Sequence, residues 1–258
     1  MARWVAFAVL TGIVVAVLLI FARRSGQLVD ELAAEPTAEP ELPDNADHLG
    51  APAPGPTPPR VSKTALLANV AASHGAFAAI LIVGIVLADV PLSALGVGSG
   101  TVSGTSAVGV GVAIGLVISV VNIAAGSVAD AFDADPSGPL RELLAPDSRR
   151  GWIALLLVVL PIIAGFEELL FRGILIGAFA AGFDLSPWLL AAGSSVLFGA
   201  GHGAQGWVGI VATGVLGFVL AAMFVLTGSL LVVALAHYVV NAVEFVFVEG
   251  LEYEPFGD

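Results

Sequence analysis

Two acidic residues and an arginine interrupt a long apolar stretch near the middle of the chain. The motif "EELLFRG" places Glu167, Glu168 and Arg172 where lipid-compatible side chains would be expected, and each charge in hydrocarbon is costly. Glu168 and Arg172 are four residues apart, in the acid-first order that favours an ion pair on a helix. Pairing Glu168 with Arg172 leaves the carboxylate of Glu167 without a partner. An unpaired carboxylate in an apolar helix indicates a role in catalysis.

Two other apolar stretches carry polar residues at helical spacing. "FGAGH" places Phe198 four residues before His202, and "HYVVN" places His237 four residues before Asn241; residues four apart share one face of a helix. Taken singly, each group is equally well explained by helix packing. Together with Glu167, however, two histidines and an amide supply the groups of a water-activating site. A carboxylate accepts a proton, histidines orient water or bind a metal, and an amide donates to an oxyanion.

Other nucleophiles find less support in the sequence. The chain has no cysteine, which excludes a thiolate nucleophile, thiolate metal sites and disulfides. Ser194 and Ser195 lack a GxSxG turn, and the zinc-protease motif HExxH is absent. His74 and Asn122 stand alone in their apolar segments, and we expect them to make ordinary interhelical hydrogen bonds.

The composition predicts an all-α fold, a polytopic membrane helix bundle. Of the 258 residues, 58% are hydrophobic and only 12% are charged, whereas a soluble domain has about 25% charged residues. Apolar runs of about 20 residues, long enough to cross a bilayer, recur along the chain. We expect about seven transmembrane helices, at residues 4–21, 65–88, 105–128, 152–181, 187–203, 207–227 and 229–248. The fourth is longer than a bilayer requires and must tilt, protrude, or break at Pro161 or Gly165.

Shifts in composition divide the chain into four parts. We expect an N-terminal transmembrane helix (1–24), an acidic Pro-rich linker (25–62), a helical core (63–250) and an acidic tail (251–258). The net charge of −12 comes largely from the linker and tail. Acidic solvent-facing segments favour a halophilic archaeal source. The alternative is an acidic linker that says nothing about the source. Neither interpretation fits a nucleic-acid partner, whose binding requires basic patches.

The basic residues predict how the chain lies in a cell membrane. Membrane proteins carry an excess of Lys and Arg in cytoplasmic loops. With the N-terminus outside and the C-terminus cytoplasmic, only Arg3 falls on the outer side. The cytoplasmic set is then Arg23, Arg24, Arg60, Lys63, Arg141, Arg149 and Arg150.

The three motifs resemble those of the CAAX-protease and bacteriocin-processing (CPBP) family of intramembrane proteases, which is related to the CAAX prenyl endoprotease. "EELLFRG" resembles its Glu-Glu-x-x-x-Arg motif, "FGAGH" its Phe-x-x-x-His motif and "HYVVN" its His-x-x-x-Asn motif, in the family's order. The resemblance covers roughly residues 65–250. It implies a helical bundle whose membrane-embedded site hydrolyses peptide bonds in a membrane-embedded or lipidated protein or peptide.

The resemblance also implies roles for single residues. Glu167 is the general base with His202 beside it, and His237 and Asn241 help to bind the water or the oxyanion. The supporting residues are Glu168, Phe171, Arg172 and Phe198.

Two alternatives stay open at the level of the sequence. A divalent metal such as zinc, held by Glu167, His202 and His237, would serve in place of direct water activation by Glu167 and His202. A non-enzymatic membrane protein, either a transporter or a chaperone-like partner on the same scaffold, is the second functional hypothesis. Intramembrane Glu and His relays also serve transporters, but the internal repeats common in transporters are not evident in the sequence.

Overall fold

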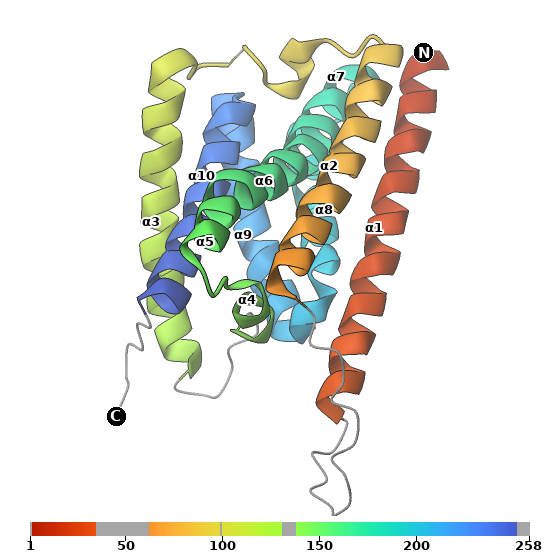
Figure 1. Ribbon diagram of the computed structural model, residues 1–258. Coiled ribbons are helices and arrows are strands. Elements are labelled where there is room, and N and C mark those ends of the chain that lie inside the picture. The colour runs from red at the N-terminus through yellow and green to blue at the C-terminus, as the bar shows by residue number, and fades with distance from the viewer. Residues whose placement is uncertain (1, 35–61, 99, 131–137, 252–258) are drawn as a thin grey trace, which may run out of the picture.

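The computed structural model describes residues 2–34, 62–98, 100–130 and 138–251 (Figure 1). All regular elements within these ranges are helices, which confirms the all-α prediction. The α-helices are α1 (Ala2–Ala34), α2 (Lys63–Leu87), α3 (Gly104–Asp130), α4 (Gly138–Leu144), α5 (Arg149–Ala154), α6 (Leu160–Glu168), α7 (Phe179–Phe183), α8 (Pro187–Gly201), α9 (Gly206–Thr227) and α10 (Leu230–Glu244). Short 3₁₀ turns form η2 (Leu92–Leu95) and η5 (Gly203–Gln205), and π-helical segments form η3 (Leu155–Val159), η4 (Leu169–Ala178) and η6 (Phe245–Gly250).

Six helical segments of the described chain are long and apolar enough to cross a membrane, so the protein is a multi-pass helical membrane protein. The fifth of the seven expected spans is instead the shorter helix α8, with 15 residues. At about 1.5 Å per residue it is about 22 Å long, less than the roughly 30 Å of a hydrocarbon core. His202, which caps the C-terminal end of α8, therefore need not lie at the membrane surface.

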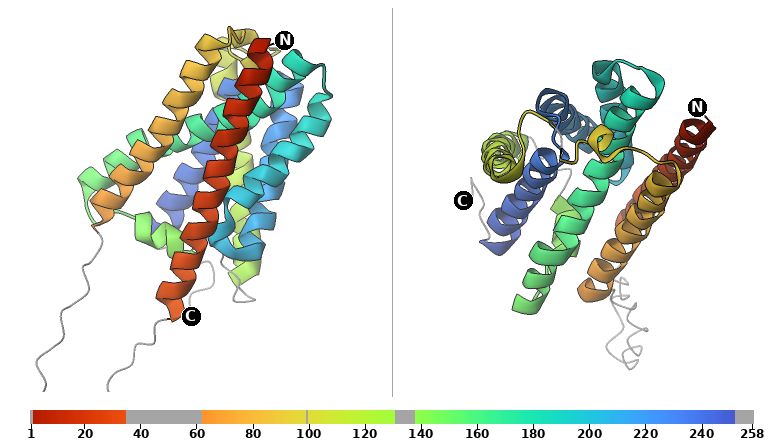
Figure 2. Two further views of the ribbon diagram at one scale, coloured as in Figure 1. Left: turned by 90° about the vertical axis from the view of Figure 1, so that its right-hand side faces the viewer. Right: turned by 90° about the horizontal axis from the view of Figure 1, so that it is seen from above.

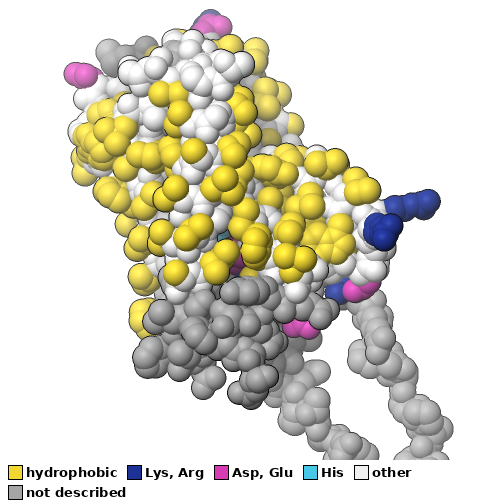
Figure 3. Space-filling model, turned by 90° about the vertical axis from the view of Figure 1, so that its left-hand side faces the viewer, with side chains coloured by type: hydrophobic (Ala, Val, Ile, Leu, Met, Phe, Trp, Pro, Cys, Tyr) yellow, Lys and Arg dark blue, Asp and Glu magenta, His cyan; other side chains and the backbone are white. Residues whose placement is uncertain are grey.

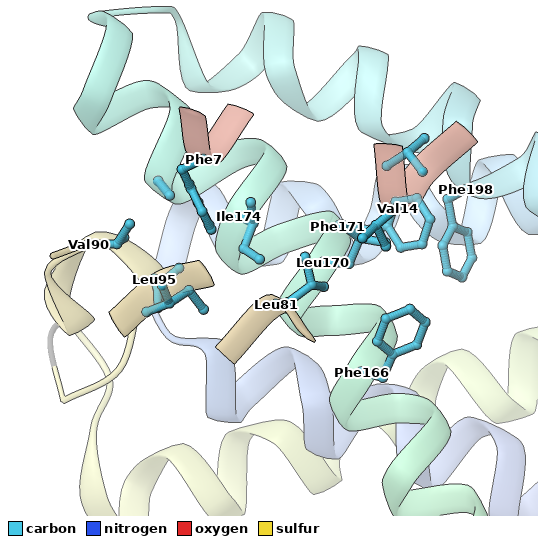
Figure 4. Packing of buried hydrophobic residues seen from close by; sticks show 13 residues of the cluster. Phe7, Val14, Leu81, Val90, Leu95, Phe166, Leu170, Phe171, Ile174 and Phe198 are labelled. Carbon is cyan, nitrogen blue, oxygen red and sulfur yellow. The ribbon is translucent and has the colours of Figure 1, made fainter. Parts of the chain in front are cut away.

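The N-terminal helix is longer and more involved in the core than the sequence predicts. α1 continues to Ala34, into the segment expected to be linker, while residues 35–61 and 252–258 lie outside the described chain. Phe7 and Val14 of α1 are buried in the main hydrophobic cluster. Figure 4 shows them beside Leu81 of α2 and the η4 residues that they cover. α1 is therefore part of the packed bundle.

The long fourth segment is one continuous helical run from Arg149 to Phe183, without the break considered at Pro161 or Gly165. Its 35 residues span about 50 Å, so the run has to tilt, and it crosses the bundle obliquely in Figure 1. The π-helical segment η3 directly precedes α6, which carries Pro161 in its first turn. The wider π-helical turn lies where the ring of Pro161 would otherwise clash with the backbone carbonyl of the residue four positions earlier.

This run passes through the middle of the molecule. Seen from above in Figure 2, it lies between α2 and α10, and both helices contact α6. Five consecutive residues, from Leu170 to Ile174, are buried, as expected for a helix that is surrounded on all sides. The charged motif of this run is consequently placed at the centre of the bundle.

The outer surface of the bundle is apolar, in contrast to the charged motif at its centre. Figure 3 shows hydrophobic side chains spread over the side of the molecule on which α3 lies. The exposed residues of α3 include Val108, Val112, Leu116, Val117, Val120 and Val121. A contiguous apolar surface of this kind is typical of contact with lipid.

Glycines of α3 hold α10, the helix that carries His237, at close range. Gly111 and Gly115 form a GxxxG pair, a spacing that lets membrane helices approach closely. A Cβ at Gly115 would lie 2.8 Å from the carbonyl oxygen of Ala236 and 2.7 Å from Cβ of Val239. Because backbone cannot move aside as a side chain does, even alanine would push α10 away.

We expect Gly115→Ala to destabilise the protein by about 1–3 kcal/mol, as overpacking does, and to lower its thermal unfolding midpoint in detergent. Gly109→Ala is the matched control, since Gly109 is on the same helix and a Cβ there meets nothing within 4 Å. The control should be neutral or slightly stabilising. Equal midpoints for the two variants would show that α3 and α10 are not held together in this way.

Candidate active site

A buried ion pair lies at the centre of the site. Glu168 and Arg172 have 0% and 1% of their surface exposed, and Nη1 of Arg172 donates to Oε1 of Glu168 at 2.5 Å. Nη2 of Arg172 donates to the carbonyl oxygen of Gly217 on α9 at 2.9 Å, and its guanidinium lies 4.6 Å from the centre of the Phe198 ring. The pair that the sequence predicts is present, and it connects the central helix to α8 and α9.

Glu168 also fixes the ring of His237. Nδ1 of His237 lies 2.7 Å from Oε1 of Glu168. Because an ionised carboxylate only accepts hydrogen bonds, Nδ1 carries the hydrogen and Nε2 of the neutral ring is left with its lone pair. Nε2 faces Oε2 of Glu167 at 3.7 Å. The ion pair therefore orients a basic nitrogen toward the second carboxylate.

Glu167 differs from its neighbour in having no direct partner. Its side chain is 13% exposed, and it is faced by Nε2 of His237 at 3.7 Å and Nε2 of His74 at 4.0 Å. Both distances are too long for a direct hydrogen bond, and no hydrogen bond to this carboxylate occurs within the described part of the chain. Glu167 is thus the carboxylate that remains able to accept a proton.

His74 on α2 is the residue that sequence reasoning left out of the site. We expected an interhelical hydrogen bond, but Nδ1 of His74 bonds to the carbonyl oxygen of Val70 in its own helix, at 2.8 Å. The ring packs edge-on against Phe166 on α6, with 5.4 Å between the ring centres, and Nε2 faces Glu167. The sequence indicated His74 only as an isolated histidine in an apolar segment. It does not say which helix that histidine faces.

His202, one turn after Phe198, is in contact with the Phe198 ring. Its Nδ1 is 2.8 Å from the carbonyl oxygen of Phe198, where it donates, and the two rings are 4.7 Å apart. The Phe198 ring is in turn 6.0 Å from the ring of His237. The Phe198 ring is therefore near both histidine rings, whereas no ion pair joins His202 to Glu167 within the described residues.

Asn241 lies one turn after His237 on α10 and is half-buried. Its side chain has no hydrogen bond within the described ranges, so its amide is free to bind a substrate group. Of the four expected catalytic residues, Glu167 and His237 thus face each other directly. The Phe198 ring contacts the rings of both His202 and His237, and Asn241 lies one turn after His237 on α10.

The two supporting phenylalanines pack between the polar residues. Phe171 and Phe198 are both buried and meet edge to face, with ring centres 5.0 Å apart. Ser194 of α8 donates to the carbonyl oxygen of Phe171 at 2.7 Å, so this buried hydroxyl is used in joining α8 to the central run. These contacts set the position of α8 and hence of His202.

The described residues do not bring together a metal-binding set. Within residues 2–34, 62–98, 100–130 and 138–251, no group of three or more His, Asp or Glu side chains has a suitable arrangement. Among these described residues, Glu167, His202 and His237 do not form such a group, and we assign no step of the reaction to a metal.

A cavity of about 190 Å³ lies elsewhere, lined by residues that include Ala94, Gly177 and Phe224. None of the charged or histidine residues of the site lines it. The cavity therefore adds no group to the site around Glu167.

Comparison with known proteins finds a similarity over this part of the chain. No curated protein and no solved structure matches the sequence. Residues 149–243 match the family model described as type II CAAX prenyl endopeptidase Rce1-like. The match begins with α5 and ends within α10, so it contains Glu167, His202, His237 and Asn241 and leaves out α1, α2 and α3. Residues 149–243 are therefore similar to Rce1-like proteins, in agreement with the resemblance carried by the three motifs.

Proposed function

We propose that this protein is an intramembrane endopeptidase in which Glu167 is the general base. The similarity to Rce1-like proteins and the apolar spans indicate a CAAX-type protease of the membrane. The observation that supports the role of Glu167 is the difference between the two carboxylates. Glu168 bonds to Arg172 and His237, whereas Glu167 has no direct partner and lies between two histidine nitrogens.

The first step is attack by water on the peptide carbonyl carbon. Nε2 of His237 and Oε2 of Glu167 are both acceptors and lie 3.7 Å apart, a gap that one water can bridge with a hydrogen bond to each. Glu167 takes a proton from this water as its oxygen bonds to the carbon. The carbonyl oxygen becomes an oxyanion, to which the amide of Asn241 donates a hydrogen bond.

The second step breaks the peptide bond. Glu167 returns the proton to the leaving nitrogen, the C–N bond cleaves, and a carboxylic acid and an amine are released. His202, like His237, donates through Nδ1 and presents a free Nε2. On the resemblance of its motif, we assign it to water activation beside Glu167.

The substrate is a protein or peptide that reaches this site within the membrane. The description of the matched family names CAAX prenyl endopeptidases, so a lipidated C-terminal peptide is the first substrate to test.

For the orientation of the protein in the membrane, we keep the N-terminus outside. The ion pair of Lys63 with Asp147 joins the start of α2 to the segment before α5, and the ion pair of Arg3 with Asp89 joins the opposite ends of α1 and α2.

Replacing Glu167 by Gln should abolish cleavage while the fold is kept. We expect kcat to fall by at least about 100-fold, the usual contribution of a general base, with little change in the unfolding midpoint. Cleavage is measured on a prenylated CAAX peptide in proteoliposomes and by comparing protein termini in membranes with and without the enzyme. Glu142→Gln, on exposed Glu142 of α4, is the matched control and should stay fully active. Undiminished cleavage by Glu167→Gln would rule out its role as the base.

Chelators should leave the activity unchanged, because the described residues do not assemble three metal ligands. The measurement is the rate of peptide cleavage before and after exhaustive treatment with EDTA and 1,10-phenanthroline, together with the zinc content of the purified protein. Complete inactivation that zinc alone reverses would contradict a site that works through water, Glu167 and histidine.

A further inference from the structure

The carboxylate of Glu167 has to be held in one orientation if it is to act as a base. Catalytic groups must be kept within about 0.5 Å of their working position. Yet Glu167 accepts no direct hydrogen bond within the described chain. The groups that face its two oxygens are Nε2 of His237 at Oε2 and Nε2 of His74 at Oε1. Of these two histidines, His237 already shares the attacking water with Glu167 in the proposed mechanism.

The tautomer of His74 decides what can lie between it and Glu167. Its Nδ1 bonds to the carbonyl oxygen of Val70, which only accepts, so Nδ1 carries the hydrogen and Nε2 of the neutral ring is an acceptor. A lone pair and a carboxylate oxygen then face each other at 4.0 Å. A water is suited to this gap, because it can donate one hydrogen to each of two acceptors with bonds of about 2.8 Å.

The geometry points to His74 as a positioning residue of the active site. Its Nε2 and Oε1 of Glu167 hold a water between them, and this bridge fixes the orientation of the carboxylate so that Oε2 is presented to His237. The inference rests on the proposed function. It extends the site to α2, a helix outside the segment that matches the family model.

Three substitutions separate this role from simpler ones. In His74→Gln the side-chain amide reaches the place of Nε2, and in His74→Asn it reaches only the place of Nδ1, the atom bonded to Val70. His74→Phe keeps the ring contact with Phe166 and has neither nitrogen. We expect His74→Gln to retain most of the activity, and the Asn and Phe variants to lose about 10- to 100-fold in kcat with KM unchanged, as misplacement of a catalytic group does.

The opposite order would overturn the inference. Full activity in His74→Asn with loss in His74→Gln would mean that the bond to Val70 is what matters, and full activity in His74→Phe would mean that ring packing is what matters. Glu167→Gln is measured beside these variants. If that variant cleaves as fast as the parent protein, the proposed function fails, whatever the His74 variants do.

A second measurement does not depend on cleavage. An experimental structure at a resolution that shows waters should contain one within about 3.2 Å of both Nε2 of His74 and Oε1 of Glu167. The same water should persist in His74→Gln and be absent in His74→Asn. Direct contact between the two side chains, or a gap without ordered water, would contradict the inference.

Discussion

One buried carboxylate, that of Glu168, organises the site. Its Oε1 accepts from both Arg172 and His237, so a residue on α6 is joined to residues on η4 and α10. Taking two charges out of water is costly, and their mutual attraction offsets that cost only when the geometry is good and further hydrogen bonds satisfy the remaining atoms. The carbonyl oxygen of Gly217 and the face of the Phe198 ring supply part of that compensation.

The backbone around this pair is shaped to allow it. A π-helical segment, η4, begins immediately after Glu168 and contains Arg172, and such wide turns are frequently found at functional sites. Gly217 leaves room for Phe198, since a Cβ there would lie 2.9 Å from the ring. Gly199 allows α8 to approach α9, because a Cβ there would lie 2.6 Å from the carbonyl oxygen of Ile210. Small residues thus let three helices surround the ion pair.

Much of the fold could be predicted from the sequence, because spans of apolar residues and charged loops determine where membrane helices begin and end. The pairing of Glu168 with Arg172 followed from their four-residue spacing. The short length of α8 did not follow, and the sequence left open whether the fourth span tilts or breaks at Pro161, since both depend on how neighbouring helices pack. In the same way, the motifs indicated His202 and His237 together, whereas only the packed bundle shows that His237 faces Glu167 and that the Phe198 ring contacts both histidine rings. The place of His74 depends on which side of α2 meets α6, and one sequence does not contain that information.

The central claim, that Glu168 and Arg172 form one coupled unit within the bundle, is tested most directly by a double-mutant cycle of unfolding free energies. Glu168→Gln and Arg172→Met should each destabilise the protein by about 3–5 kcal/mol, because each leaves a buried charge without its partner. The double variant removes both charges and keeps an acceptor for His237. It should therefore be more stable than the sum of the single effects predicts, by about 1–3 kcal/mol. Additive effects of the two substitutions would contradict the account.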